Sequence, residues 1–405
     1  MQRYDSYKDS GIQWLGEIPS HWEVKHLRNF LTIFSEKGHG DKQLLSVTRE
    51  NGVILRDKEN KEENHNFVPD DLSGYKHVYA GDFVINKMKS WQGSYGVSDY
   101  EGIVSPAYFT CKLRGVNPKF FSRAIRSKAY IGFFMQFSKG IRVDQWDLDP
   151  NSMKDIPFVL PSLPEQQAIA SYLDEATAKI DEAIAQQQKM IDLLNERKQI
   201  IINNAVTKGL NPNAKMKPSG IDWIGNIPDH WEVRKLKQIA KLRSGDTISS
   251  DQFTTSGFPV FGGNGFRGYT DRYTNEGNYV LIGRQGALCG NVNYADGKFF
   301  ATEHAVVVYP HSSENVIWLG ECIKASNLNQ YSQSAAQPGL AVSVIGNVSY
   351  PYPPTEERDS IAEYIRQNTE RLDCSINNAT KQITLLQERK QIIINDVVTG
   401  KVKII

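Results

Sequence analysis

The chain contains two internal repeats, and they limit its possible architectures more than any other feature. The segment Ser10–Val24, SGIQWLGEIPSHWEV, returns as Ser219–Val233, SGIDWIGNIPDHWEV. Further along, Leu193–Asn203 returns with one substitution as Leu385–Asn395, while the residues between the paired segments hardly match. Because repeats with long periods indicate repeated structural units, we infer one duplicated frame that presents two different variable regions.

Each half ends in a segment with the spacing of a long amphipathic helix. Its apolar residues recur at alternating steps of four and three, the coiled-coil period. They include Ile169, Leu173, Ile180, Ile184, Ile191, Leu194 and Ile201 in the first half, and Ile361, Ile365, Leu372, Ile376, Ile383, Leu386 and Ile393 in the second. Prolines precede both segments and Gly209 and Gly400 follow them, as at helix ends. A helix of about 40 residues is about 60 Å long. We expect the two helices to bury their apolar faces by pairing antiparallel; the alternative is that each packs on its own domain.

The variable regions mix the patterns of strands and helices. Strands are predicted at 76–86, 102–111, 278–283 and 304–309, and helices at 118–137 and 316–326. The predicted class is therefore α+β, with two globular domains joined by two long helices in an antiparallel coiled coil and related by a pseudo-two-fold repeat. The predicted parts are a globular domain with a Trp-rich opening segment (1–160), a long helix (161–209), a second globular domain (210–352), and a long helix with a tail (353–405).

Charge is balanced overall but uneven along the chain. The formal net charge is +1, which by itself does not indicate a nucleic-acid partner. Between Glu101 and Asp144 there is no acidic residue, and the cations there are Lys112, Arg114, Lys119, Arg123, Arg126, Lys128, Lys139 and Arg142. Such a stretch attracts phosphate backbones; the alternative is an ordinary solvated helix face.

The cysteines and the lack of long apolar runs favour a cytoplasmic location. Cys111, Cys289, Cys322 and Cys374 are far apart and lack metal-ligand spacing, which is typical of reduced thiols. No apolar run approaches the roughly 18 residues of a membrane span, and the first residues do not resemble a signal peptide. We expect a cytoplasmic protein without membrane contact.

Motifs for catalysis and cofactor binding are weak or missing. Gly263–Gly268 matches GxGxxG, but no helix start follows it, as dinucleotide binding requires. The eight histidines show no zinc-ligand spacing, and His21 and His230 belong to the repeated segment, which favours a structural role. With no nucleophile–base arrangement, we expect no catalytic residue, no metal site and no cofactor bound by this chain.

Loop residues of the variable regions are the candidates for contacts with a partner. Arginine reads guanine, and asparagine or glutamine reads adenine, through paired hydrogen bonds in the major groove, while lysine and arginine also hold phosphates. The candidates for DNA binding are Lys87, Lys89, Trp91, Gln92, Tyr95, Lys139, Arg142, Asn264, Arg267, Arg284, Gln285 and Gln337. For each residue, an ordinary surface position is the alternative.

The chain resembles the specificity subunits of type I restriction–modification enzymes over essentially its whole length. The resemblance rests on the repeated SGIxWxGxIPxHWEV segment, on the helix ends at 194–207 and 386–399, and on the motifs at 258–270, 281–287 and 301–305. The first helix begins Leu163-Pro-Glu-Gln-Gln, as the family prefers. The second begins Thr355-Glu-Glu-Arg, so the resemblance leaves its first residue open.

The resemblance implies a non-catalytic subunit that recognises double-stranded DNA. Two target recognition domains would each read one half of a split, asymmetric site, and the helices would set the spacer. The helices would also hold two modification subunits, which methylate adenine with S-adenosylmethionine. Two restriction subunits that use ATP and Mg would join through them.

Two other function classes are compatible with parts of the pattern. A purely structural coiled-coil scaffold would explain the helices but not the acid-free stretch at 103–143, which a spacer does not need. An enzyme with an unrecognised active site would transfer methyl groups on its own.

Overall fold

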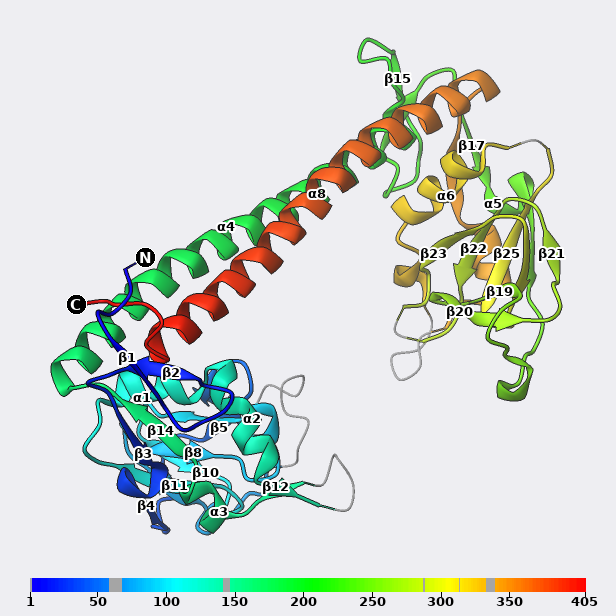
Figure 1. Cartoon of the computed structure of the whole chain (residues 1–405). Coiled ribbons are helices and arrows are strands. Elements are labelled where there is room, and N and C mark those ends of the chain that lie inside the picture. The colour runs from blue at the N-terminus through cyan, green and yellow to red at the C-terminus, as the bar shows by residue number, and fades with distance from the viewer. Residues whose placement is uncertain (1, 58–67, 141–145, 287, 313, 333–338) are drawn as a thin grey trace. The chain divides into compact units, whose positions relative to one another are not determined.

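The computed structural model describes residues 2–57, 68–140, 146–286, 288–312, 314–332 and 339–405. They form two compact units, the first from Met1–Gln187 with Lys381–Ile405 and the second from Gln188–Thr380. Each unit contains a globular part and segments of two long helices, α4 (Leu163–Lys208) and α8 (Thr355–Val398) (Figure 1). The unit boundaries fall inside both helices, and the domain boundaries predicted at their ends stay predictions.

The described residues of the first unit's globular part combine short strands with the α-helices α1 (Pro118–Ile125), α2 (Lys128–Gln136) and α3 (Pro150–Lys154). Its strands are β1 (Tyr7–Asp9), β2 (Glu17–Pro19), β3 (Glu23–His26), β4 (Leu31–Phe34), β5 (Leu45–Thr48), β6 (Gly52–Leu55), β7 (Lys76–Val78), β8 (Phe83–Ile85), β9 (Tyr95–Val97), β10 (Gly102–Val104), β11 (Phe109–Leu113), β12 (Ser138–Lys139), β13 (Asp147–Leu148) and β14 (Pro157–Leu160). The central sheet has the order β4-β11-β8-β9.

The globular part of the second unit contains α5 (Leu236–Ile239), α6 (Val316–Ala325) and α7 (Val342–Asn347). Its strands are β15 (Met216–Pro218), β16 (Asn226–Pro228), β17 (Glu232–Lys235), β18 (Ala240–Ser244), β19 (Phe258–Gly262), β20 (Gly265–Thr270), β21 (Asn275–Glu276), β22 (Tyr279–Gly283), β23 (Val292–Ala295), β24 (Lys298–Ala301), β25 (Ala305–Pro310) and β26 (Ser349–Tyr352). A central sheet has the order β18-β25-β22-β23, and a second sheet has the order β20-β19-β24-β21.

The two central sheets share one topology although their sequences hardly match. In each, the neighbours are antiparallel, and the strands stand in the order first, fourth, second and third along the chain. A two-stranded ladder from the repeated segment accompanies each sheet, β3 with β14 in one unit and β17 with β26 in the other. The duplication inferred from the repeats therefore extends through the variable regions.

The structure confirms the predicted strands and helices, but some of them are divided into two shorter elements. The expected strand at 76–86 is divided into β7 and β8 by a turn at Gly81, whose φ of 92° favours glycine. The expected helix at 118–137 is two helices, α1 and α2. Among the described helices, none is long and apolar enough to cross a membrane.

The antiparallel pairing of the long helices is confirmed inside each unit. The first unit joins the beginning of α4 to the end of α8, and Lys390 Nζ lies 2.6 Å from Asp181 Oδ1. The second unit joins the end of α4 to the beginning of α8, and Lys198 Nζ lies 2.7 Å from Asp373 Oδ1. These two ion pairs occupy equivalent positions of the repeat.

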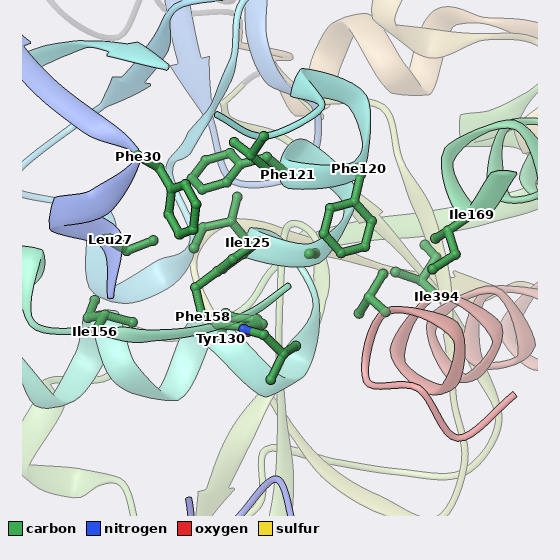
Figure 2. Close-up of a cluster of buried hydrophobic side chains, with 14 of the residues drawn as sticks. Leu27, Phe30, Phe120, Phe121, Ile125, Tyr130, Ile156, Phe158, Ile169 and Ile394 are labelled. Carbon is green, nitrogen blue, oxygen red and sulfur yellow. The ribbon is translucent and has the colours of Figure 1, made fainter. Parts of the chain in front are cut away.

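The ends of the helices also complete the core of each globular part. In the first unit, Ile169 of α4 and Ile394 of α8 join the buried cluster that contains Phe120 and Phe158 (Figure 2). In the second unit, Val206 of α4 and Ile361 of α8 join the corresponding cluster around Trp231. The helices therefore pair with each other and pack on the globular parts, so the two sequence-based alternatives are both realised.

The repeated His-Trp pair fastens each globular part to the first turn of a long helix. In the first unit, His21 Nε2 and Trp22 Nε1 each lie 3.0 Å from the carboxylate of Glu165. In the second unit, His230 and Trp231 hold Glu357 at 2.6 and 2.9 Å. We call these two sets the latches. They confirm the structural role expected for both histidines. The first residue of α8, which the resemblance left open, is Thr355, and it is equivalent to Leu163 of α4 in the repeat.

Candidate nucleic-acid interface

In the second unit, four of the predicted residues come from two adjacent turns and the strand that follows the first of them. Asn264 lies in the two-residue turn between β19 and β20, Arg267 lies on β20, and Arg284 and Gln285 follow β22. The turns approach closely because both carry glycine: a Cβ on Gly283 would collide with the carbonyl of Gly263. Three of the side chains, those of Asn264, Arg267 and Gln285, are exposed.

Arg284 is held at this edge with its guanidinium only partly used. Its Nη1 donates to Ser244 Oγ at 2.8 Å, and its backbone N–H donates to the carbonyl of His304 at 3.0 Å. The Nε of this half-buried side chain has no hydrogen-bond partner among the described residues. Backbone hydrogen bonding thus fixes the position of Arg284, while N–H groups of its guanidinium remain able to donate to a ligand.

Buried polar atoms without a partner gather around the same two turns. Within the described part of the chain, they are Arg284 Nε, Asn293 Nδ2, Thr302 Oγ1, Glu303 Oε2 and His304 Nδ1. Two of these side chains lie close to the glycines beside the β19–β20 turn. A Cβ built on Gly265 would lie 2.9 Å from Asn293 Oδ1, and one built on Gly262 would lie 3.6 Å from Thr302 Oγ1. We call these residues, with Asn264, Arg267 and Gln285, the reading edge. Unpaired buried polar atoms are uncommon and need a ligand or water, so this edge is suited to polar recognition.

Asn293, Glu303 and His304 lie at this edge but were not among the residues predicted from the sequence. Glu303 and His304 belong to the motif at 301–305 that carried part of the family resemblance, so a signal was available. Asn293 lies on β23 in an ordinary strand pattern, and only the fold brings it beneath the turn.

In the first unit, the predicted residues gather where the segment after β8 meets the β12–β13 hairpin. Lys87 Nζ forms an ion pair with Asp147 Oδ2 at 2.8 Å. Lys139 on β12 stands opposite Asp147 of β13 in the antiparallel backbone ladder. Trp91 packs edge-to-face on Trp146 with ring centroids 5.6 Å apart, and its Nε1 has no partner among the described residues. Lys89 and Lys139 are exposed, and Gln92 is half-buried. The fold therefore brings this set together as well.

Tyr95 was predicted wrongly, and two other predicted residues lie outside the described residues. Tyr95 is fully buried, its ring stacks on Phe134 at 4.0 Å, and its hydroxyl donates to the carbonyl of Ile125. Burial raises the pKa of this hydroxyl, so Tyr95 is a core residue. The two outside the described residues are Arg142 and Gln337.

Several cations of the acid-free stretch are paired within the described part of the first unit. Acidic residues from elsewhere in the sequence reach it: Asp82 pairs with Lys112 at 3.0 Å, and Asp174 pairs with Lys119 and Arg123 at 3.1 and 3.0 Å. Arg126 donates to backbone carbonyls, including that of Arg49 at 2.9 Å. The charges of Lys112, Lys119 and Arg123 are thus balanced inside the unit, which reduces the predicted positive field.

The expected absence of a metal site stays a prediction, although the fold brings together histidines that are far apart in the sequence. Glu36, His39 and His77 are brought together in the first unit, with one possible ligand atom of each within 4.8 Å of the others. Sequence spacing did not reveal this cluster because β7 and the loop after β4 become neighbours only in the fold.

Comparison with known proteins places both halves of the chain among similar sequences. Residues 228–385 match the family model of the type I restriction modification DNA specificity domain. The chain is 40% identical over 153 residues to the type I restriction enzyme EcoprrI specificity subunit of Escherichia coli, a match that covers 36% of this chain and 37% of that protein. It is 24% identical over 428 residues to the putative type I restriction enzyme MjaX specificity subunit of Methanocaldococcus jannaschii, covering 96% of both.

The fold has a counterpart among solved structures. A chain from a structure described as the structural basis underlying complex assembly and conformational transition of the type I R-M system matches with a TM-score of 0.69. The identity is 14%, and the match covers 95% of this chain and 99% of that chain. Two domains of mixed helix and strand joined by long helices are therefore an arrangement that known proteins share.

Proposed function

We propose that this chain, which belongs to the specificity subunits of type I restriction–modification enzymes, is the non-catalytic subunit that recognises a bipartite, asymmetric site in double-stranded DNA. Each unit reads one half of the site. The observation that carries this proposal is the reading edge, where unpaired polar atoms collect on two glycine-bounded turns inside the matched specificity domain.

The chemistry of the reading edge suits the edges of base pairs. Arginine can donate two hydrogen bonds to guanine, glutamine and asparagine can pair with adenine, and glutamate can accept from the amino group of cytosine. Arg284, Gln285, Asn264 and Glu303 supply these groups from one small region. The first unit presents a different set, Lys87, Trp91, Gln92 and Lys139. Since the two sets differ, the two half-sites differ.

The test is a map of methylated adenines in cells that express this chain with its methyltransferase partner. Arg284→Lys keeps the charge but loses the paired donors, and Gln285→Ala removes an exposed side chain, so neither change disturbs the core. Each should relax the half-site read by the second unit, because losing one good base contact costs about 1–3 kcal/mol. Lys215→Ala, at an exposed lysine of the same unit, is the control. Relaxation of the other half-site, or of both equally, contradicts the assignment.

Two methyltransferase subunits bind the repeated segments of the long helices. Leu193 and Ile200 on α4 are 52% and 51% exposed, and the equivalent Leu385 and Ile392 on α8 are 58% and 59% exposed. Each pair is separated by two helical turns and lies on one face of its helix. Identical apolar pairs displayed twice suit two copies of one partner, since exposed apolar patches mark interaction sites.

The binding of methyltransferase subunits to the long helices is tested by counting these subunits in the purified complex by mass spectrometry. Leu193→Ser with Ile200→Ser should remove one subunit, and Leu385→Ser with Ile392→Ser should remove the other. Met190→Ser is the matched control because Met190 is 51% exposed on α4, but its equivalent on α8 is Gln382. Loss of both subunits from either double variant, or of none from both, contradicts the proposal.

The remaining parts of the proposal concern the partners and the spacer. The complex acts in the cytoplasm. The methyltransferase subunits supply S-adenosylmethionine chemistry, restriction subunits that use ATP and Mg join through them, and this chain binds no cofactor for catalysis. Four residues inserted after both Gln187 and Ala379, equivalent positions of the paired helices, should add about 6 Å. The spacer should then lengthen by about two base pairs, and an unchanged spacer contradicts this role of the helices.

A further inference from the structure

Two histidines and a glutamate from separate segments of the first unit converge on one small volume. Glu36 and His39 lie in the loop that follows β4, whereas His77 is the middle residue of β7. Glu36 Oε1 is 2.9 Å from His39 Nε2 and 3.6 Å from His77 Nδ1. None of these residues takes part in the reading edge or in the latches.

His77 is buried with one ring nitrogen paired and the other unpaired. Its side chain is 3% exposed, and Nε2 lies 3.1 Å from Glu101 Oε1, so a proton on Nε2 is shared with that carboxylate. Nδ1 faces Glu36 and has no hydrogen-bond partner among the described residues. A buried nitrogen lone pair beside a carboxylate is unfavourable unless a proton or a cation lies between them.

The neighbours of the cluster have the arrangement that surrounds metal-bound histidines. Such a histidine usually donates its second ring N–H to a carboxylate, which fixes the tautomer, and Glu101 is placed for this role. Lys42 Nζ holds Glu101 at 2.9 Å, and the hydroxyl of Tyr79 donates to Glu36 at 3.1 Å. The backbone N–H of His77 donates to the carbonyl of Glu36 at 2.8 Å, so strand and loop are already aligned.

The donor atoms suit a transition-metal ion, and the distances are near those of a bound site. In a tetrahedral zinc site with bonds of about 2.1 Å, ligand atoms are about 3.4 Å apart. The two distances from Glu36 Oε1 lie on either side of this value. The rings of His39 and His77 stack with centroids 4.3 Å apart and 24° between their planes, so the partly exposed His39 side chain must turn to direct Nε2 at a shared ion. Imidazole nitrogens suit zinc and related ions, whereas magnesium and calcium take oxygen ligands. Glu36 and His39 are partly exposed, which leaves a path for the ion and room for water as a fourth ligand.

We propose that Glu36, His39 and His77 bind one divalent transition-metal ion of the zinc type. The ion ties the loop between β4 and β5 to β7 and stabilises the first unit. This role is structural and goes beyond DNA recognition.

The first test is calorimetric titration of the metal-stripped, full-length chain with zinc chloride, followed by thermal unfolding. We expect one zinc ion per chain and a higher unfolding temperature, since a ligand of the folded state stabilises it by mass action. His77→Ala should abolish binding, and His39→Gln, at a partly exposed position that tolerates substitution, should weaken it at least about tenfold. His26→Ala, which removes an exposed histidine of the same unit, should change nothing. Equal zinc binding by the wild type and both cluster variants would overturn the proposal.

The second test asks whether Glu101 supports the ion from outside the cluster. With a metal site, zinc raises the unfolding temperature, and Glu101→Gln weakens zinc affinity by about tenfold because it removes the outer carboxylate. An unfolding temperature that zinc leaves unchanged, or equal zinc affinity of the wild type and Glu101→Gln, would overturn the proposal. Circular dichroism confirms that each variant is folded.

Discussion

The two units share one frame and differ in what that frame presents. Their central sheets have the same strand order, and the same repeated segment supplies a latch and a two-stranded ladder to each. The sheet β20-β19-β24-β21 of the second unit, whose hairpin carries part of the reading edge, has a counterpart in the first unit. There the ladders β5-β6 and β7-β10 are joined by a parallel bridge between Leu44 and Ile103, so the strands follow the same order with shorter pairing. Recognition can therefore diverge at loops and in the extent of strands while the frame stays constant.

The two latches have the same motif but differ in the burial of their carboxylate and in the number of its hydrogen-bond donors. The side chain of Glu165 is 4% exposed and accepts hydrogen bonds from Tyr4 at 2.6 Å and from Trp22 at 3.0 Å. The side chain of Glu357 is 41% exposed, and its donors are His230 and Trp231. The N-terminal segment that carries Tyr4 makes the difference. Burial beside Glu165 also raises the pKa of the Tyr4 hydroxyl.

The largest expected effect is the contrast between Glu165→Ala and Glu357→Ala. Loss of Glu165 leaves buried donors on Tyr4 and Trp22 without partners and should lower the free energy of unfolding by about 3 kcal/mol. Loss of Glu357 should lower it by about 1 kcal/mol, because water can reach the donors that remain. Chemical denaturation measures both values. Glu356→Ala, at an exposed carboxylate of the same helical turn, is the control. Equal decreases in the free energy of unfolding for the two latch variants would show that burial does not determine how much each latch stabilises the protein.

A smaller contrast is expected at the glycines that end the long helices. Gly400 and Gly209 have φ values of 76° and 73°, so alanine is strained at both. A Cβ on Gly400 would collide with the ring of Pro19, whereas one on Gly209 would lie 3.0 Å from Trp231 Cζ2. We expect Gly400→Ala to lower the free energy of unfolding by about 2 kcal/mol and Gly209→Ala by about 1 kcal/mol. Scanning calorimetry ranks them, and the reverse order would contradict the comparison.

The smallest effect should come from the two equivalent ion pairs between the long helices, where the units should behave alike. Double-mutant cycles to alanine at Lys198 with Asp373, and at Lys390 with Asp181, should each give a coupling of about 0.5 kcal/mol, because both pairs are partly exposed. The coupling should fall at high salt. A coupling above about 2 kcal/mol in one pair alone would break the equivalence of the two halves.

Sequence reasoning was strongest where the signal was local or repeated. The seam from Ile169 and the glycines at 209 and 400 predicted both long helices, and the repeated segments predicted two related units. Asn264, Arg284 and Gln285, predicted as loop residues flanked by glycine, do lie in or next to turns, and the fold makes these turns neighbours. Their role in DNA binding stays a prediction. Sequence reasoning failed for Tyr95, because an aromatic residue in a Gly-flanked, cationic segment looks the same whether it faces solvent or the core.

The amino-acid sequence by itself determined the duplicated frame, since helix periodicity, end glycines and repeats are properties of neighbouring residues. Only the tertiary structure decided which charges stay free, because Asp82 and Asp174 approach the acid-free stretch from distant positions. The same holds for the convergence of His39 with His77 and of Asn293 with the turn at Gly263–Asn264. Such contacts depend on how strands and loops pack, and the spacing of residues along the chain carries no record of that packing.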